Sequence, residues 1–120
     1  MAVTLTIANA NVLNQTNQPG VITYYGTVVA SGNYAAGGNT LAMNVANYTS
    51  SKAPVWVNIT GKAAAYRYIW VPAATPTVAS PGTIKVIDYT AAPAAELAAG
   101  AYPAAVTDDV ITVQIIAPNR

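Results

Sequence analysis

Apolar and polar residues alternate with a period of two along most of this 120-residue chain, and no other feature constrains its fold as strongly. Successive side chains of a β-strand point to opposite faces, so this alternation is typical of strands with one buried face. Four segments have an apolar residue at every second position: Val3, Leu5 and Ile7; Leu41, Met43 and Val45; Val55, Val57 and Ile59; Ile111, Val113 and Ile115. Each of these segments predicts a strand.

Three further segments also predict strands. Residues 21–30 and 65–71 are apolar or aromatic at successive positions, as expected of strands covered on both faces, and residues 83–89 make a seventh candidate. Clusters of glycine, proline, asparagine and serine separate the segments and indicate turns. Seven or eight short strands at this spacing predict an all-β fold, a small antiparallel β-sandwich or barrel.

The one helical signal lies in the alanine-rich residues 91–105. Alanine has the highest helix propensity, but Pro93, Gly100 and Pro103 interrupt the segment. We therefore expect an ordered loop with at most a short helical turn around residues 94–98. Because this length is typical of one domain, we expect residues 1–120 to form a single β domain.

Charged residues are unusually scarce. They make up 8% of the chain, compared with about 25% in ordinary soluble domains, and the first 51 residues contain none. The formal net charge is only +1. Because such a surface offers little charge repulsion between molecules, it tends to associate. The composition therefore favours a component of an assembly.

Few residue types are available for catalysis. Histidine and cysteine are absent, and the carboxylates are Asp88, Glu96, Asp108 and Asp109. Neighbouring side chains in an extended chain point to opposite faces, so we expect Asp108 and Asp109 to form a solvated turn rather than a catalytic pair. The motifs of serine nucleophiles, phosphate loops and calcium loops are missing. We expect no enzyme activity, no catalytic residue, no cofactor and no metal.

Neither nucleic acid nor a membrane is an expected partner. The five lysine and arginine residues are scattered, although nucleic-acid binding needs them clustered. Tyr66, Tyr68 and Trp70 alternate in one strand, where core or interface positions are more common than a platform for bases. Polar residues interrupt every apolar stretch before the about 18 residues that a membrane helix needs. The N-terminal segment lacks the pattern of a secretory signal.

Residues 26–41 carry a recognisable pattern, in which a strand is followed by S-x-x-Y-x-x-G-G-x-x-L. Ser31, Tyr34, the Gly37-Gly38 pair and Leu41 occupy its specified positions. The segment resembles one found in head decoration proteins of tailed phages, also called cement or minor capsid proteins, which are encoded beside the major capsid gene.

The C-terminal half is similar to the same family in the order of its segments. An aromatic strand (66–71) precedes a Lys-Val strand (84–86), an alanine-rich loop (95–98) and a final strand (109–115). The two stretches together cover well over half of the chain. Residues 71–81 depart from the family, because they are rich in alanine, proline and threonine where the family has more acidic residues. This departure concerns the loop conformation more than the fold.

The resemblance implies a structural virion component. Such a decoration protein binds the outer surface of the capsid, stabilises contacts between major capsid subunits, and commonly forms a homotrimer at three-fold positions. The implied partners are the major capsid protein and further copies of this chain, and the implied location is the capsid exterior after synthesis in the host cytoplasm. The low charge agrees with this, since burying unpaired charges in an interface is costly.

Two groups of residues are candidates for the interface. The first is the uncharged N-terminal arm, residues 1–18, in which the strand of Val3, Leu5 and Ile7 could pair with the sheet edge of a neighbouring subunit. An ordinary first strand of the chain's own sheet is equally compatible with the pattern. The second group consists of large aromatic residues, which dominate interface energetics but also fill cores: Tyr24, Tyr34, Trp56, Tyr66 and Trp70.

Trp56 is the best interface candidate among the aromatic residues, because the alternation points it away from the face of Val55, Val57 and Ile59. Two alternatives to a decoration protein stay open. One is a tail, baseplate or fibre-associated structural protein. The other is a carbohydrate-binding β-sandwich, in which a row of exposed aromatic residues flanked by asparagine would stack on and hydrogen-bond sugars.

Overall fold

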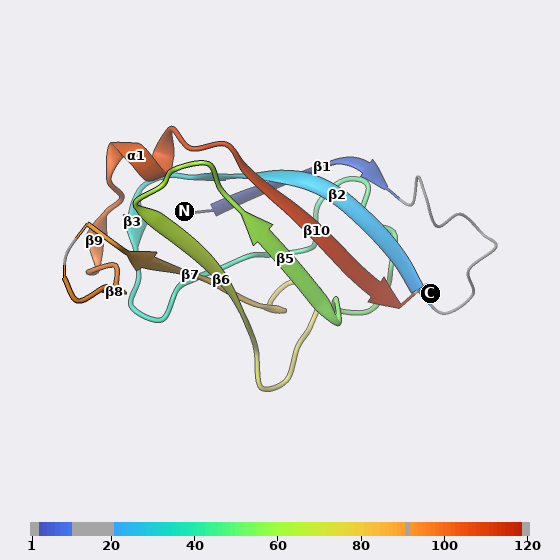
Figure 1. Cartoon of the computed structure of the whole chain (residues 1–120). Helices are drawn as coiled ribbons and strands as arrows, with labels where there is room; N and C mark the ends of the chain where they lie inside the picture. Colours follow the sequence, from blue (N-terminus) through green and yellow to red (C-terminus); the bar gives the residue numbers. More distant parts are fainter. Residues whose placement is uncertain (1–2, 11–20, 91, 119–120) are drawn as a thin grey trace.

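The computed structural model describes residues 3–10, 21–90 and 92–118, and these residues confirm the all-β fold (Figure 1). Six of their strands have five residues or more: β1 (Val3–Ala10), β2 (Val21–Ala30), β5 (Trp56–Thr60), β6 (Tyr66–Pro72), β7 (Gly82–Asp88) and β10 (Ile111–Pro118). Two-residue strands and one four-residue helix complete the set: β3 (Asn33–Tyr34), β4 (Asn39–Thr40), β8 (Ala95–Glu96), β9 (Gly100–Ala101) and α1 (Ala104–Thr107).

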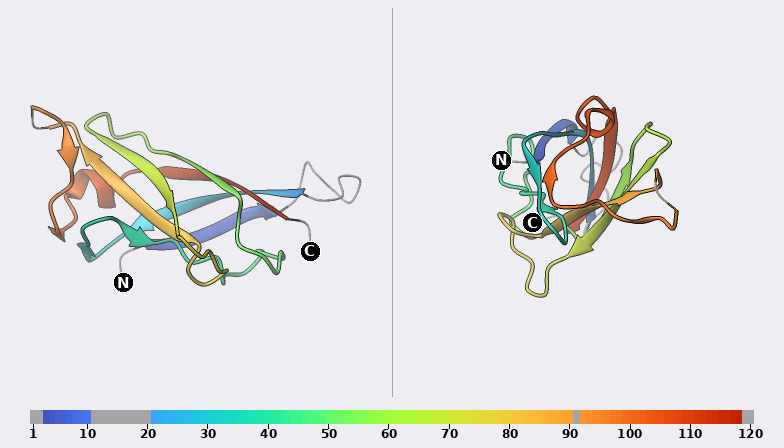
Figure 2. Two further views of the ribbon diagram at one scale, coloured as in Figure 1. Left: turned by 90° about the horizontal axis from the view of Figure 1, so that it is seen from below. Right: turned by 90° about the vertical axis from the view of Figure 1, so that its left-hand side faces the viewer.

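Four strands form an antiparallel sheet in the order β1, β2, β10, β5, which we call the first sheet. In the second sheet, β6 and the short strands β4 and β8 pair with β7. β6 and β7 lie across the strands of the first sheet at an angle (Figure 2). Although β5 and β6 are consecutive, no pairing joins them within the described residues. The fold is therefore a two-layer sandwich rather than a closed barrel.

A single hydrophobic core lies between the two sheets. The first sheet contributes Leu5, Ile22, Tyr24, Val28, Val57, Ile111, Val113 and Ile115; the second contributes Tyr68, Ile84 and Val86; the connecting segments contribute Leu41 and Met43. Burying one aliphatic side chain of this size stabilises the fold by about 1.5–3 kcal/mol. The core explains why strands were correctly predicted where the period-two pattern is strict, as in β10.

The prediction that residues 21–30 and 65–71 are covered on both faces is wrong. β2 buries every second residue, whereas Val29 on its other face is 55% exposed. In β6, Ile69 is 46% exposed and Arg67 is also exposed. Apolar residues therefore occur on the solvent side of both strands, which the sequence pattern does not distinguish from a second buried face.

Residues 40–46 were predicted to form a strand, but the regular strand β4 ends at Thr40. Leu41 and Met43 are fully buried, as the alternation indicates. Their amides donate single hydrogen bonds to the carbonyls of Gly82 (3.1 Å) and Val78 (2.8 Å). The alternation therefore reports burial correctly here, although the segment has no continuous ladder partner.

Residues 94–98, where at most a short helical turn was expected, form no helical turn, because β8 pairs with β7 there and places Glu96 opposite Ile87. The helix lies further along the chain and begins after Pro103, whose missing N–H costs nothing at a helix start. Pairing with β7 thus overrides the helix propensity of alanine in β8.

Candidate binding surfaces

Several residues predicted for the interface belong instead to the core. Leu5 is 5% exposed, Tyr34 is 2% exposed and Tyr24 is fully buried. The Tyr24 hydroxyl accepts hydrogen bonds from the amides of Thr49 (3.1 Å) and Ser50 (3.0 Å). Since their side chains are enclosed by the chain's own fold, these residues do not form a docking surface, and the prediction for them is corrected.

The N-terminal strand pairs with the chain's own sheet. Val3 lies opposite Ala30 and Ile7 opposite Gly26, and β1 is the outermost strand on that side of the first sheet. The side chains of Val3 and Ile7, and residues 11–18 of the arm, lie outside the described set. β1 is therefore an edge strand, and its contact with a neighbouring subunit stays a prediction.

The aromatic row in β6 faces the core. Tyr68 is buried, and Tyr66 and Trp70 are half-buried and pack against the core cluster. The two predicted interface residues of this row, Tyr66 and Trp70, therefore present only part of their rings to solvent. A row inserted in the core in this way does not offer a platform for bases.

Trp56 lies on the surface, as predicted. Its side chain is 55% exposed, whereas Val57 is buried on the opposite face of β5. Val55, expected on the buried face, is 63% exposed because it precedes the strand. Two more exposed apolar residues lie on β6, namely Ile69 (46%) and Val71 (37%). Val55, Trp56 and Ile69 line one hollow, and we call these three residues the β5–β6 surface.

A hollow of about 360 Å³ lies at the β5–β6 surface. Residues of β5 and β6 line it, including Trp56, Ile69, Trp70 and Pro72. None of the described residues that line this hollow is charged. The β5–β6 surface therefore combines exposed apolar side chains with a concavity, the features that mark protein interaction sites.

Two tyrosine–carboxylate contacts were missed by the sequence analysis. Tyr34 donates a hydrogen bond to Glu96 (2.6 Å) and accepts one from the amide of Val86 (3.3 Å). Burial and the Glu96 contact raise the pKa of Tyr34 to about 12. The Tyr34 hydroxyl and the amide of Gly37 (2.5 Å) both donate to Glu96 and hold the pKa of its carboxyl below the usual value.

The Glu96 contact gives the S-x-x-Y-x-x-G-G-x-x-L pattern a structural role. Tyr34 and Gly37 from the pattern both bind Glu96 in β8. Gly38 has φ +100°, and a Cβ atom there would lie 2.5 Å from the Ile84 carbonyl oxygen. The pattern therefore attaches the loop to β7 and β8 and is part of the fold rather than a docking site.

Asp109 makes the second contact. A turn precedes β10 as predicted and leaves Asp108 exposed, but Asp109 is half-buried. Its carboxylate accepts hydrogen bonds from the Tyr68 hydroxyl (2.7 Å) and the amides of Lys62 (2.8 Å) and Ala63 (3.0 Å). Burial raises the pKa of Asp109, but these hydrogen bonds outweigh it and hold the pKa below its usual value. A Cβ atom on Gly61 would lie 2.4 Å from this carboxylate, so the close approach requires glycine.

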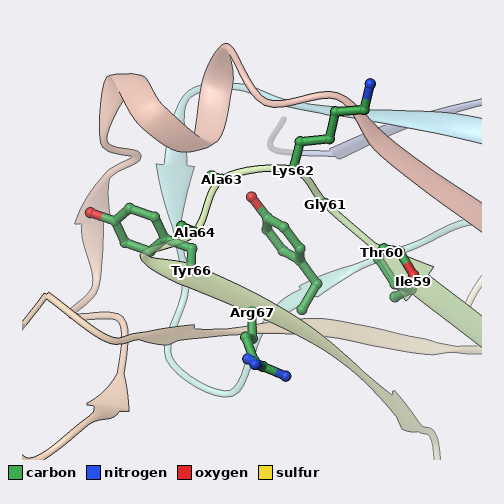
Figure 3. A pocket seen from close by; sticks show the side chains of 9 residues that line it. Ile59, Thr60, Gly61, Lys62, Ala63, Ala64, Tyr66 and Arg67 are labelled. Atoms are coloured by element: carbon green, nitrogen blue, oxygen red, sulfur yellow. The ribbon is translucent and has the colours of Figure 1, made fainter.

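A further hollow of about 400 Å³ lies beside this contact and is lined by residues 59–64 and 66–68. Its two cationic side chains, Lys62 and Arg67, point to opposite sides (Figure 3). The Arg67 guanidinium lies 5.6 Å from the centre of the Tyr89 ring instead. The hollow therefore lacks the converging charges of an anion site. Across the described ranges, no three acidic side chains gather to hold a metal ion.

The outer face of the first sheet is the last candidate surface. It carries exposed threonines and amide side chains around a hollow of about 540 Å³. In the part of the chain that the structure describes, no helix is long and apolar enough to cross a membrane. Comparisons with protein-family models, with curated proteins and with solved structures find no match to this chain.

Proposed function

We propose that this chain is a non-catalytic structural protein that docks on another protein, and that it decorates the capsid exterior of a tailed phage. The β5–β6 surface carries the proposal of docking, because it leaves Trp56 and two aliphatic residues, Val55 and Ile69, exposed around one hollow. The family resemblance of residues 26–41 and of the C-terminal half supports the capsid setting. In this role the protein binds the major capsid protein and stabilises contacts between its subunits.

The size of the β5–β6 surface supports a docking role. Complete burial of a large apolar side chain contributes about 1.5–3 kcal/mol, so burying the exposed half of three such residues contributes about 2–4.5 kcal/mol. Association itself costs several kcal/mol, so a stable complex needs further contacts. A trimer that binds through several copies of the surface supplies them, since linked sites multiply affinity.

The scarcity of charge supports the same role. The uncharged lining of the β5–β6 hollow can be buried without removing ions from water, which is the costly step in forming an interface. The charge-free first 51 residues extend this property over much of the chain. We therefore expect binding to depend only weakly on salt, because screening acts on charges and not on apolar contact.

The proposal is tested by co-sedimenting purified protein with undecorated shells of the major capsid protein encoded in the same genome. Trp56→Ala and Ile69→Ala each shorten an exposed side chain of the β5–β6 surface. Val110→Ala is the matched control, because Val110 is 52% exposed but lies before β10.

We expect Trp56→Ala to weaken binding by about 30-fold, the effect of a 2 kcal/mol hot spot, and Ile69→Ala to weaken it less. Val110→Ala should bind as the unmodified protein does. Equal binding by all three variants, each with an unchanged melting temperature, would show that the β5–β6 surface does not contact the capsid.

A further inference from the structure

Threonines from all four strands of the first sheet form one row. Thr6 lies opposite Thr27, Thr27 opposite Thr112, and Thr112 opposite Thr60. All four side chains are exposed. Because neighbouring strands are about 4.8 Å apart, this threonine row presents one hydroxyl group per strand at that spacing across the sheet.

A second row, of larger polar side chains, runs beside the threonine row. Gln114 in β10 lies between Tyr25 in β2 and Asn58 in β5. The Asn58 amide donates to the Gln114 side-chain oxygen at 3.4 Å, so the two amides are held together. The second row and three members of the threonine row, Thr27, Thr112 and Thr60, line the hollow of about 540 Å³, which we call the sheet hollow.

The sheet hollow differs chemically from the β5–β6 surface. None of its described lining residues is charged, and its outward-facing groups are the hydroxyls of Thr27, Thr60 and Thr112, the amides of Asn58 and Gln114, and one tyrosine ring. Protein interfaces rely instead on large apolar residues and arginine, and threonine is rare among their hot spots. The composition of the hollow therefore suits a small hydroxyl-rich ligand better than a protein surface.

We infer that the sheet hollow binds a neutral glycan built of hexose units. Threonine hydroxyls and side-chain amides each donate and accept hydrogen bonds, as sugar hydroxyls do. The uncharged hollow complements an uncharged ligand, since no ion has to be desolvated. The ring of Tyr25 offers an apolar face for the C–H side of a sugar, with its hydroxyl left for a hydrogen bond.

The threonine row also fits the shape of such a ligand. A glycan lying across the strands would pass Thr60, Thr112 and Thr27 in turn, at a spacing close to that of successive sugar rings. Asn58 and Gln114 flank this path on one side. This binding activity goes beyond capsid docking and does not rest on it. Asn58 borders both hollows, but the docking proposal rests on Trp56 and Ile69, which do not line the sheet hollow.

The test is a titration of isotope-labelled full-length protein, followed by NMR, with maltohexaose, cellohexaose and laminarihexaose in turn. We expect at least one hexaose to give saturable shifts at amides of β2, β5 and β10. The Asn58→Ala, Gln114→Ala double variant should weaken that affinity by about tenfold or more. Tyr89→Phe, a change at an exposed residue just after β7 in the second sheet, serves as the folded control and should keep the affinity.

The inference is overturned if no hexaose causes saturable shifts, or if the double variant, with its native spectrum retained, binds as the unmodified protein does. Shell co-sedimentation separates this failure from that of capsid docking. If Gln114→Ala alone, whose residue lines the sheet hollow and not the β5–β6 hollow, loses shell binding while no hexaose binds, the sheet hollow is a protein interface and the glycan inference is wrong. If hexaoses bind but shells do not, the glycan site stands and the docking proposal fails.

Discussion

Replacing Tyr68 by phenylalanine tests whether the Asp109 contact stabilises the sandwich. The change removes the hydroxyl that donates to Asp109 at 2.7 Å and leaves the buried ring in place. A hydrogen bond to a charged group contributes about 1.5–3 kcal/mol. Because Asp109 keeps its bonds from the amides of Lys62 and Ala63, the carboxylate is not left without donors, and we expect the lower end of that range.

The assay is urea unfolding at neutral pH, with Tyr66→Phe as the matched control. Tyr66 lies on the same face of β6 and is half-buried, so its substitution should change the free energy of unfolding by no more than about 0.5 kcal/mol. For Tyr68→Phe we expect a loss of about 1.5 kcal/mol, or about 6 °C in melting temperature for a chain of this length. An equal effect of the two substitutions would refute a stabilising role of the Asp109 contact.

Three further predictions concern the fold and its assembly. The pKa values of Glu96 and Asp109 are lowered in the fold, so the stabilisation that their carboxylates provide is present above the unfolded pKa of about 4 and is lost as pH falls through the folded values. In melting curves from pH 6 to pH 2.5, the double variant Glu96→Gln, Asp109→Asn should lose less melting temperature than the unmodified protein. An equal loss in both proteins would contradict this prediction. Gly38→Ala should destabilise by about 2 kcal/mol or more in urea unfolding, because of its positive φ and the contact with Ile84, whereas a neutral effect would exclude this close approach. Light scattering should give the mass of a trimer at low and high salt, and a monomer at all concentrations would exclude self-association in solution.

The sequence predicted the fold class and several strands because burial follows the period-two alternation directly. In β10, Ile111, Val113 and Ile115 are all buried, as their spacing indicates. The same pattern failed to predict pairing in residues 40–46, since alternating burial at Leu41 and Met43 does not require a ladder partner. Pairing depends on a second segment, which a local pattern does not contain.

The candidate sites were predictable only in part. Trp56 was placed on the surface because its neighbour Val57 belongs to a clear apolar face. Tyr24 and Tyr34 were predicted for an interface, but they lie in the core. An aromatic ring suits an interface and a core equally well, so only the fold decides between the two. The Asp109 contact joins residues 41 positions apart, so no local signal announces it.

The threonine row could not be predicted from the sequence either. Its members come from four strands, and their alignment depends on the register of three strand pairs. Thr27 and Thr112 are ordinary strand residues when taken singly, since threonine has a high β propensity. That these threonines form one row on the surface is known only from the order and register of the strands.

The binding isotherm of the unmodified protein on undecorated capsid shells, at low and at high salt, tests the central claim most directly. We expect saturable binding with a definite number of copies per shell, and an affinity that changes little with salt because apolar contact dominates. Absence of saturable binding at either salt concentration would contradict the proposal that this chain docks on the capsid.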